Sequence, residues 1–260
     1  MIREKEIREI EEEIRRTPYN KATQKHIGML KAKLARLKEE KGGGGKRSGP
    51  GYAVKKSGDA TVLLVGFPSV GKSTLLNRIT NAESRVGDYD FTTLDIVPGI
   101  MEYKGAKIQI LDIPGVVEGA SSGRGRGREI LSVVRNADLV LIMIDARKPE
   151  HLKTVRNELY SAGFRLDENP PDIRIIRKPR GGIEISSAKG MSRADRETIK
   201  SILQEFRINN AEVLVREEFR IDRLIDSIAK NRVYMPSIVV VNKIDMVSKP
   251  PELGGETVLI

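Results

Sequence analysis

The chain of 260 residues contains no cysteine, which excludes a disulfide framework, a thiolate metal site and a cysteine nucleophile. It also lacks a long apolar run, since the longest wholly apolar stretch, residues 139–144, is far too short to cross a membrane. Residues 1–16 mix acidic and basic side chains without an apolar core, so a secretory signal is missing too. We therefore expect a soluble cytoplasmic protein with no membrane partner.

Positive charge is concentrated in two parts of the chain, whose formal net charge is +10. Residues 1–57 hold 16 Lys and Arg against 8 Asp and Glu, a net +8. Residues 165–235 hold 15 against 12, a net +3, and the remaining residues are close to neutral at −1. A nearly neutral body with basic accessory segments indicates a polyanionic partner for those segments.

Three kinds of segment follow one another along the chain. Residues 2–16 and 20–41 have apolar side chains at helical spacing and predict an antiparallel helical hairpin, with Asn20 as an N-cap. From residue 60, apolar runs alternate with helix-forming segments, which is typical of an α/β fold with a mostly parallel sheet and helices on both faces. Residues 170–232 interrupt this rhythm and are interpreted as an inserted small α+β domain.

The sequence predicts a basic helical hairpin at residues 1–45 and a linker at 46–57. The α/β domain is expected in two parts, residues 58–169 and 233–260, with the inserted domain at 170–232 between them. Within the α/β domain we expect strands at 61–65, 96–103, 106–113, 139–144 and 237–241. We expect its helices at 71–80, 125–136 and 149–161.

A glycine-rich loop separates the first of these strands from the first helix. Residues 66–73, here called the phosphate loop, read Gly-Phe-Pro-Ser-Val-Gly-Lys-Ser and fit G-x-x-x-x-G-K-[ST]. The glycines let backbone N–H groups and the helix N-terminus face phosphates, while Lys72 reaches the β- and γ-phosphates and Ser73 can ligate Mg²⁺. A plain glycine turn is the alternative, but both flanking elements that the motif requires are present. The residues expected to contact nucleotide are Gly66, Pro68, Ser69, Val70, Gly71, Lys72, Ser73 and Thr74.

An aspartate lies near the end of the predicted strand 106–113. Asp112 is followed by Ile-Pro-Gly, and this Asp-x-x-Gly stands 40 residues after Lys72. An aspartate at a strand end can hold the Mg²⁺ shell, and the N–H of Gly115 can contact a γ-phosphate. Such a tetrapeptide alone is usually a turn, but on a strand neighbouring the phosphate loop it predicts a metal ligand.

Residues 242–245, here called the base loop, read Asn-Lys-Ile-Asp after the predicted strand 237–241. The Asp245 carboxylate can accept two hydrogen bonds from the N1–H and N2–H₂ edge of guanine, a donor pair that adenine lacks. The stem of Lys243 can cover the base, and Asn242 can tie this loop to the phosphate loop. The base loop therefore predicts GTP and GDP as ligands; an ATPase is the alternative if Asp245 does not face the base.

Phe91-Thr92-Thr93 lies between the phosphate loop and Asp112, among turn-forming residues. A threonine here can ligate Mg²⁺ only when the γ-phosphate draws the loop in, which is how a nucleotide switch works. We favour Thr93 over Thr92 for this role; the alternative is a pair of β-branched residues that open a strand.

With these motifs, the sequence resembles the Obg/DRG group of GTPases, and within it the developmentally regulated GTP-binding proteins. The resemblance covers nearly the whole chain and is carried by residues 66–76, 89–94, 112–120 and 122–129. It implies a P-loop GTPase fold that binds GTP and GDP with Mg²⁺, hydrolyses GTP slowly and acts with ribosomes.

The resemblance also sets expectations for the rest of the chain. It implies that the insert is similar to domain 2 of ribosomal protein S5. It implies further that the chain stops before the Ser-Ala loop that contacts guanine and before a TGS domain. Ser187-Ala188-Lys189 imitates the Ser-Ala loop but precedes Asn242, so we interpret it as a decoy.

In Ras-like enzymes a glutamine directly after Asp-x-x-Gly positions the attacking water. Val116 stands at that place here and can neither orient water nor accept a proton. The work of catalysis then falls to Mg²⁺, Lys72, Thr93, the backbone at Gly115 and groups from a regulatory protein partner. K⁺ is a further candidate cofactor, although Ser69 replaces the asparagine that ligates it in related enzymes. We predict slow intrinsic hydrolysis.

Some polar residues outside these motifs have two interpretations. Arg124, Arg126 and Arg128 alternate with glycines and either contact RNA phosphate or the nucleotide, or lie in a flexible solvated loop. His26 and His151 stand apart from any catalytic pattern in the sequence and are interpreted as surface or packing residues.

The leading functional hypothesis is a switch in which Mg²⁺-dependent GTP hydrolysis is coupled to the ribosome or RNA through the basic hairpin, linker and insert. The alternative is a nucleotide-gated RNA-binding or assembly module with incidental hydrolysis, and Val116 is the residue that keeps this alternative open.

Overall fold

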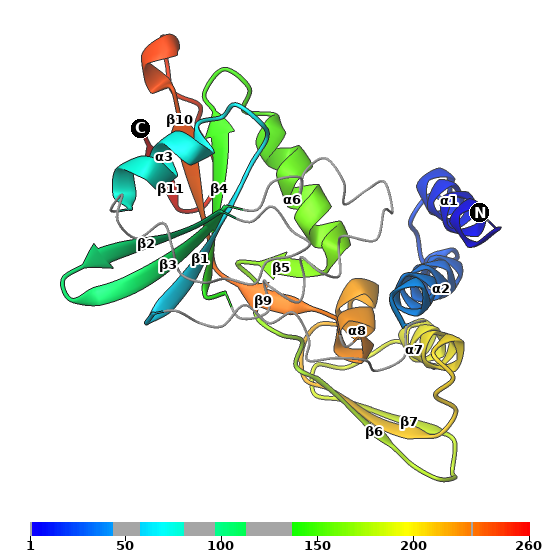
Figure 1. Ribbon diagram of the computed structural model, residues 1–260. Coiled ribbons are helices and arrows are strands. Elements are labelled where there is room, and N and C mark those ends of the chain that lie inside the picture. Colours follow the sequence, from blue (N-terminus) through cyan, green and yellow to red (C-terminus); the bar gives the residue numbers. More distant parts are fainter. Residues whose placement is uncertain (1, 44–57, 81–96, 113–136, 230) are drawn as a thin grey trace. The chain divides into compact units, whose positions relative to one another are not determined.

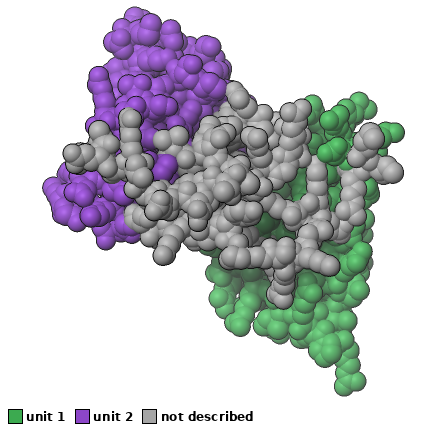
Figure 2. Space-filling view, in the orientation of Figure 1, with its two compact units in different colours: residues 1–48, 170–232 green, residues 49–169, 233–260 purple. Residues whose placement is uncertain are grey.

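A computed structural model describes residues 2–43, 58–80, 97–112, 137–229 and 231–260 (Figure 1). The chain divides into two compact units, coloured separately in Figure 2. Unit 1 comprises residues 1–48 and 170–232, and unit 2 comprises residues 49–169 and 233–260. Among the helices in these described ranges, none is long and apolar enough to span a membrane.

Unit 2 is built on a six-stranded sheet. Its strands, in order across the sheet, are β11 (Thr257–Leu259), β10 (Ser237–Asn242), β4 (Leu139–Asp145), β1 (Ala60–Val65), β3 (Ala106–Asp112) and β2 (Val97–Tyr103). Neighbouring strands are parallel except that β2 runs antiparallel to β3. These two are joined by Lys104–Gly105, both with positive φ, at 48° and 85°. This is the conformation of a two-residue hairpin turn that suits the twist of its strands.

The central strands of this sheet are buried on both faces, which explains why they are apolar throughout. Successive side chains of β1 enter different cores: Leu63 packs in a cluster with α6 (His151–Ala162), and Leu64 in a cluster with Leu76 of α3 (Lys72–Ile79). The period of two along the strand thus covers each face of the sheet with one of these helices (Figure 1).

The predicted α/β class, with a mostly parallel sheet and helices on both faces, is confirmed. Each predicted strand of this sheet begins and ends within one residue of the observed strand. The predicted helix 125–136 lies outside the described residues. The sequence reading missed β5 (Phe164–Leu166) and β9 (Val233–Met235), which form a separate parallel pair where the chain leaves unit 2 and returns to it. Strands of three residues are too short to show a periodic pattern.

Unit 1 contains a three-stranded sheet with β8 (Ala211–Val215) between β6 (Ile173–Arg177) and β7 (Ile183–Ser187). The apolar side chains of these strands form one core with α7 (Arg193–Glu205) and α8 (Ile221–Ile228). A capping box starts α7, because Ser192 and Asp195 each accept a hydrogen bond from the other's backbone N–H.

The N-terminal helices belong to the same unit: α1 (Ile2–Arg16) contacts α2 (Gln24–Gly43), and α2 packs against α7 and α8. Ala32 of α2 is fully buried in the core of the insert. Lys31 Nζ lies 2.8 Å from Asp222 Oδ2, and Gln24 Nε2 donates to Asp195 Oδ1 at 2.7 Å. The two basic segments of the sequence, although far apart along the chain, thus fold together.

We expect Ala32→Asp to destabilise unit 1 by about 3 kcal/mol, because it buries an unpaired carboxylate between α2 and α7. Hydrogen exchange of the α7 amides should report the loss as faster exchange. Ala22→Asp is the matched control, since Ala22 is exposed in the turn before α2. Equal exchange in the two variants would contradict the packing of α2 on the insert.

Candidate functional site

The phosphate loop connects the carboxyl end of β1 to the first turn of α3, and it depends on two glycines at close contacts. A Cβ at Gly66 would overlap the carbonyl oxygen of Met143 in β4. Gly71 has φ 103°, and a Cβ there would overlap the side-chain amide of Asn242. Both positions therefore require glycine for backbone approach, and at Gly71 also for conformation.

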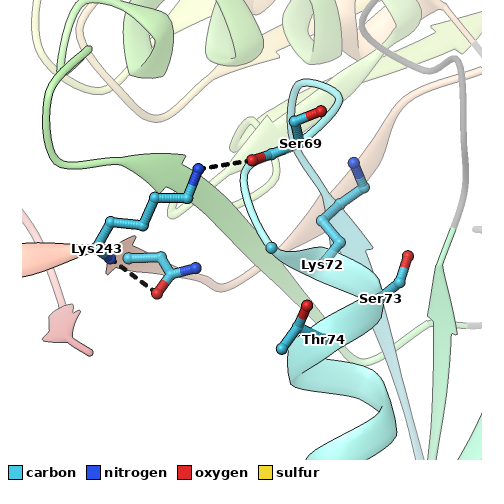
Figure 3. A pocket seen from close by; sticks show the side chains of 7 residues that line it. Ser69, Lys72, Ser73, Thr74 and Lys243 are labelled. Atoms are coloured by element: carbon cyan, nitrogen blue, oxygen red, sulfur yellow. Dashed lines mark hydrogen bonds between the residues drawn. The ribbon is translucent and has the colours of Figure 1, made fainter.

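Lys72 is the first residue of α3, and its side chain turns back over the loop. Its Nζ donates to the carbonyl oxygens of Gly66 at 3.0 Å and Phe67 at 2.9 Å. The ammonium group thereby lies beside the phosphate loop at the N-terminus of α3. Helix N-termini favour anions, so the charge of Lys72 and the helix act in the same direction here. One pocket brings the phosphate loop and the base loop together (Figure 3), and its lining consists of Ser69, Gly71, Lys72, Ser73, Thr74, Asn242 and Lys243.

Two side chains of the base loop hold the phosphate loop directly. Asn242 Nδ2 donates to the carbonyl oxygen of Val70 at 2.8 Å. Lys243 Nζ donates to the carbonyl oxygen of Ser69 at 2.8 Å (Figure 3). Lys243 has φ 64°, an uncommon backbone conformation for a residue with a side chain, and Asn242 Oδ1 accepts from its N–H at 2.8 Å. The tie between the two loops is therefore present.

Asp245 lies in the short 3₁₀ helix η2 (Ile244–Met246), and its side chain is exposed. Arg147, which follows β4, is a cation near this carboxylate. The pKa of the Arg147 guanidinium is raised chiefly by a hydrogen bond to Asp145, and the negative charge of Asp245 makes a smaller contribution. The carboxylate is thus accessible to a base, with a cation in its neighbourhood.

Asp112 ends β3 and is only 6% exposed. Burial raises the pKa of its carboxyl group, and the charge of Lys72 partly offsets this. Its Oδ1 is buried without a hydrogen-bond partner among the described residues. A buried, unsatisfied carboxylate oxygen fits a hard cation such as Mg²⁺, and the exposed hydroxyl of Ser73 is the other expected oxygen ligand.

Within the described ranges, no three His, Cys, Asp or Glu side chains cluster as a complete metal site. This suits Mg²⁺, which proteins usually hold through one or two side chains together with substrate phosphates and water. When bound, Mg²⁺ would neutralise charge on the phosphates; Ser73 and Asp112 would hold it.

Several predicted site residues lie outside the described residues. These are Thr93, Gly115, Val116, Arg124, Arg126 and Arg128. Their roles stay predictions.

The sequence reading missed one residue in this region, Asp145. It ends β4 directly opposite Asn242 of β10. Its carboxylate accepts from Arg147 Nη2 at 2.6 Å and Nε at 2.9 Å, and from Lys243 Nζ at 3.0 Å. The hydrogen bonds from Arg147, followed by those from Lys243, hold the pKa of Asp145 well below its usual value despite burial. An aspartate closing a buried parallel strand was the available signal.

The two histidines differ in their surroundings. The ring of His151 lies 4.1 Å from that of Phe67 in the phosphate loop, which agrees with a packing role. His26 is not isolated: its Nε2 is 2.9 Å from Glu13 Oε1, an exposed contact between α1 and α2 that the sequence pattern did not reveal.

Comparison with known proteins identifies the family. A model described as "50S ribosome-binding GTPase" matches residues 61–178, and one for the C-terminal region of that domain matches residues 180–252. A GTP-binding protein of Methanocaldococcus jannaschii is 61% identical over 94% of this chain and 62% of its own length. Developmentally-regulated GTP-binding protein 1 of Xenopus laevis is 50% identical over 93% of this chain and 67% of its own. The chain belongs to the family of developmentally regulated GTP-binding proteins.

A further member, developmentally-regulated G-protein 3 of Arabidopsis thaliana, is 48% identical over 93% of this chain and 67% of its own length. The chain spans 62% of the archaeal relative. The residues that match the two family models include the phosphate loop, Asp112 and the base loop.

We expect Asp145→Asn to weaken guanine-nucleotide binding by roughly tenfold, because Lys243 loses the charge that fixes its ammonium beside Ser69. Lys243→Ala should have a similar effect, and the double variant should be no weaker than either alone. Equilibrium titration with a fluorescent GDP would measure this. Arg147→Ala is the control, because Arg147 is the other partner of Asp145. If Arg147→Ala lowers nucleotide affinity as much as Asp145→Asn does, the effect of Asp145 acts through Arg147 and not through Lys243.

Proposed function

We propose that this chain binds GTP and GDP at the pocket between the phosphate loop and the base loop, and that it hydrolyses GTP slowly with Mg²⁺. The observation that carries the proposal is the convergence of three strand ends. Lys72 follows β1, Asp112 ends β3, and the base loop follows β10; these strands are parallel and their carboxyl ends lie at one edge of the sheet. Ligands of open α/β sheets bind at this edge.

Guanine rather than adenine is supported by the position of Asp245. The hydrogen bonds from Asn242 and Lys243 fix the base loop against the phosphate loop. Asp245, two residues further on, is exposed. Its carboxylate can pair with the two N–H donors of guanine and finds no such pair on adenine.

We expect Asp245→Asn to lower GTP affinity by roughly 100-fold or more and to raise affinity for xanthosine triphosphate, because an amide N–H pairs with the added carbonyl of xanthine. Competition titrations with GTP, XTP and ATP would measure this. Glu102→Gln, at an exposed carboxylate of the same unit, is the control and should change neither affinity. An unchanged preference in Asp245→Asn would remove the guanine assignment.

The roles proposed for individual residues in GTP hydrolysis follow from the chemistry of their side chains and backbone N–H groups. Lys72 and the N–H groups of the phosphate loop stabilise charge on the phosphates, and Ser73, Thr93 and Asp112 hold Mg²⁺. Gly115 offers its N–H to the γ-phosphate. Val116 cannot position water, so intrinsic turnover is slow and a regulatory partner completes the site. K⁺ is a further candidate cation for this purpose.

We expect single-turnover GTP hydrolysis without a partner to be slower than the roughly 3–5 × 10⁻⁴ s⁻¹ of glutamine-containing Ras, and to be accelerated by ribosomes or RNA. Rates measured with and without ribosomes, and in K⁺ against Na⁺, would test this. No acceleration by any ribosomal component would favour the alternative, a nucleotide-gated RNA-binding or assembly module. A single-turnover rate like that of a glutamine-containing enzyme, without any partner, would contradict the role given to Val116.

For the partner we propose the ribosome or another RNA, which would contact the basic residues of unit 1 and the linker. The support is the charge distribution: residues 1–57 carry a net +8, while the body that holds the nucleotide pocket is close to neutral. Binding of this kind weakens steeply as salt rises, because counterions are released from the phosphates.

A further inference from the structure

An exposed aromatic side chain stands at the turn of the N-terminal hairpin. Tyr19 is 67% exposed, although it lies in a segment well fixed by hydrogen bonds. A tyrosine at this exposure stabilises no core, and only 4% of the chain is aromatic. Its ring is therefore accessible to a partner, as is that of Tyr103, which is 58% exposed.

The turn that carries Tyr19 is built by its neighbours Asn20 and Thr23. Asn20 Oδ1 accepts from the backbone N–H groups of Ala22 and Thr23, both at 2.9 Å. Thr23 Oγ1 donates to the carbonyl oxygen of Pro18 at 2.6 Å and accepts from the N–H of Asn20 at 3.0 Å. Tyr19 lies between the anchored residues Pro18 and Asn20, so its backbone is held while its ring remains in solvent.

Four cations flank the ring in the same stretch, residues 15–25, which we call the hairpin tip: Arg15, Arg16, Lys21 and Lys25, all exposed. Arg16 pairs with Glu12 at 3.3 Å, but both side chains are more than half exposed, so the pair is weak. In the part of the chain that the structure describes, Arg15, Lys21 and Lys25 form no ion pair.

Three lysines of α2 outside the tip are paired with carboxylates of the same unit. Lys33 pairs with Glu6, Lys38 with Glu11, and Lys31 with Asp222 of the insert, each at 2.8 Å. Arg15, Arg16, Lys21 and Lys25 thus lie in one stretch of sequence around Tyr19, while Arg8 is a further exposed cation elsewhere on α1.

We propose that the hairpin tip binds single-stranded RNA, with Tyr19 stacking on an unpaired base and the flanking cations contacting the phosphates on either side. The proposal rests on the RNA partner proposed above and gives it a place and a mode. An exposed aromatic ring on a fixed backbone, with cations on both sides of it in the sequence, suits the binding of unpaired nucleotides, since every base offers a π-face.

The composition of the tip favours RNA over a lipid surface. Its remaining exposed residues are Pro18, Asn20 and Ala22, none of which would insert into a membrane. In the adjoining helices, Ile14 and Ile27 are at least partly buried, and Met29 is the exposed apolar side chain nearest in sequence among the described residues, at 40%. A membrane-binding turn needs several exposed apolar side chains beside the aromatic ring.

The test is fluorescence anisotropy of the full chain with a labelled single-stranded RNA and with a duplex RNA of equal length. We expect Tyr19→Ala to weaken single-strand binding by about 5- to 150-fold, the effect of one lost base stack, and to change duplex binding by less than about twofold. Tyr19→Phe should restore the single-strand affinity. Tyr103→Ala is the matched control, because Tyr103 is 58% exposed at the β2–β3 turn beside Lys104 and should change neither.

Base stacking by Tyr19 and phosphate contacts by the flanking cations can be told apart by their dependence on salt concentration. Each phosphate contact on a single strand lowers the slope of log K against log salt concentration by about 0.7. Replacing both Lys21 and Lys25 by Ala should therefore make the slope shallower by about 1.4, whereas Tyr19→Ala should weaken binding without changing the slope.

Three outcomes would overturn the proposal. Single-strand binding of Tyr19→Ala equal to that of the parent chain would show that RNA binds elsewhere, and the RNA partner itself would stand. Loss of binding to anionic phosphatidylserine vesicles in Tyr19→Ala, with RNA binding unchanged, would assign the tip to lipid. A parent chain that binds neither RNA would remove the proposed RNA partner together with its site, while guanine-nucleotide binding, measured separately, would be unaffected.

Discussion

The hydrogen bond from Asn242 to the carbonyl oxygen of Val70 is the contact on which the nucleotide pocket depends. It joins the loop after β10 to the loop after β1, although β4 lies between these strands in the sheet. The contact is possible only because Gly71 has no Cβ, since any side chain there would occupy the position of the Asn242 amide. One glycine and one asparagine, far apart in sequence, thus set the separation between the groups that would face phosphate and base.

The same edge of the sheet balances its charges through Asp145. A carboxylate that is almost fully buried needs compensation, and Arg147 and Lys243 supply it from two sides. Because Lys243 also reaches Ser69, its ammonium is held by one full charge and one carbonyl dipole. The base loop is therefore fixed at Asn242 by a neutral hydrogen bond and at Lys243 by a charged one, so its conformation does not rest on Asp245, which stays available.

Much of this could be predicted from the sequence, because the signals were local. The strands of the large sheet are apolar runs between turn-formers, and the phosphate loop, Asp112 and the base loop follow them directly. Contacts between distant segments could not be predicted in this way. The burial of Ala32 in the insert, the pair β5–β9 and the Asp145–Lys243 ion pair each join residues whose own neighbours carry no sign of the partner. The degree to which Tyr19 is exposed could not be predicted either, because it depends on the turn that the side chains of Asn20 and Thr23 build by hydrogen bonds.

The connections between the two units follow a path that matters for a switch. The chain leaves unit 2 after β5 and returns at β9, and these two strands pair with each other. Asp167 then accepts from the backbone N–H and the hydroxyl of Ser237, both at 2.6 Å, at the first residue of β10. From there β10 runs without interruption to Asn242. The two connections of the insert to unit 2 are thereby joined to the strand that carries the base loop; the third connection, after residue 48, lies outside the described residues. β10 is therefore the described element that links the connections of the insert covalently to the base loop, and a coupling between them in the proposed switch would have to be shown by its effect on both.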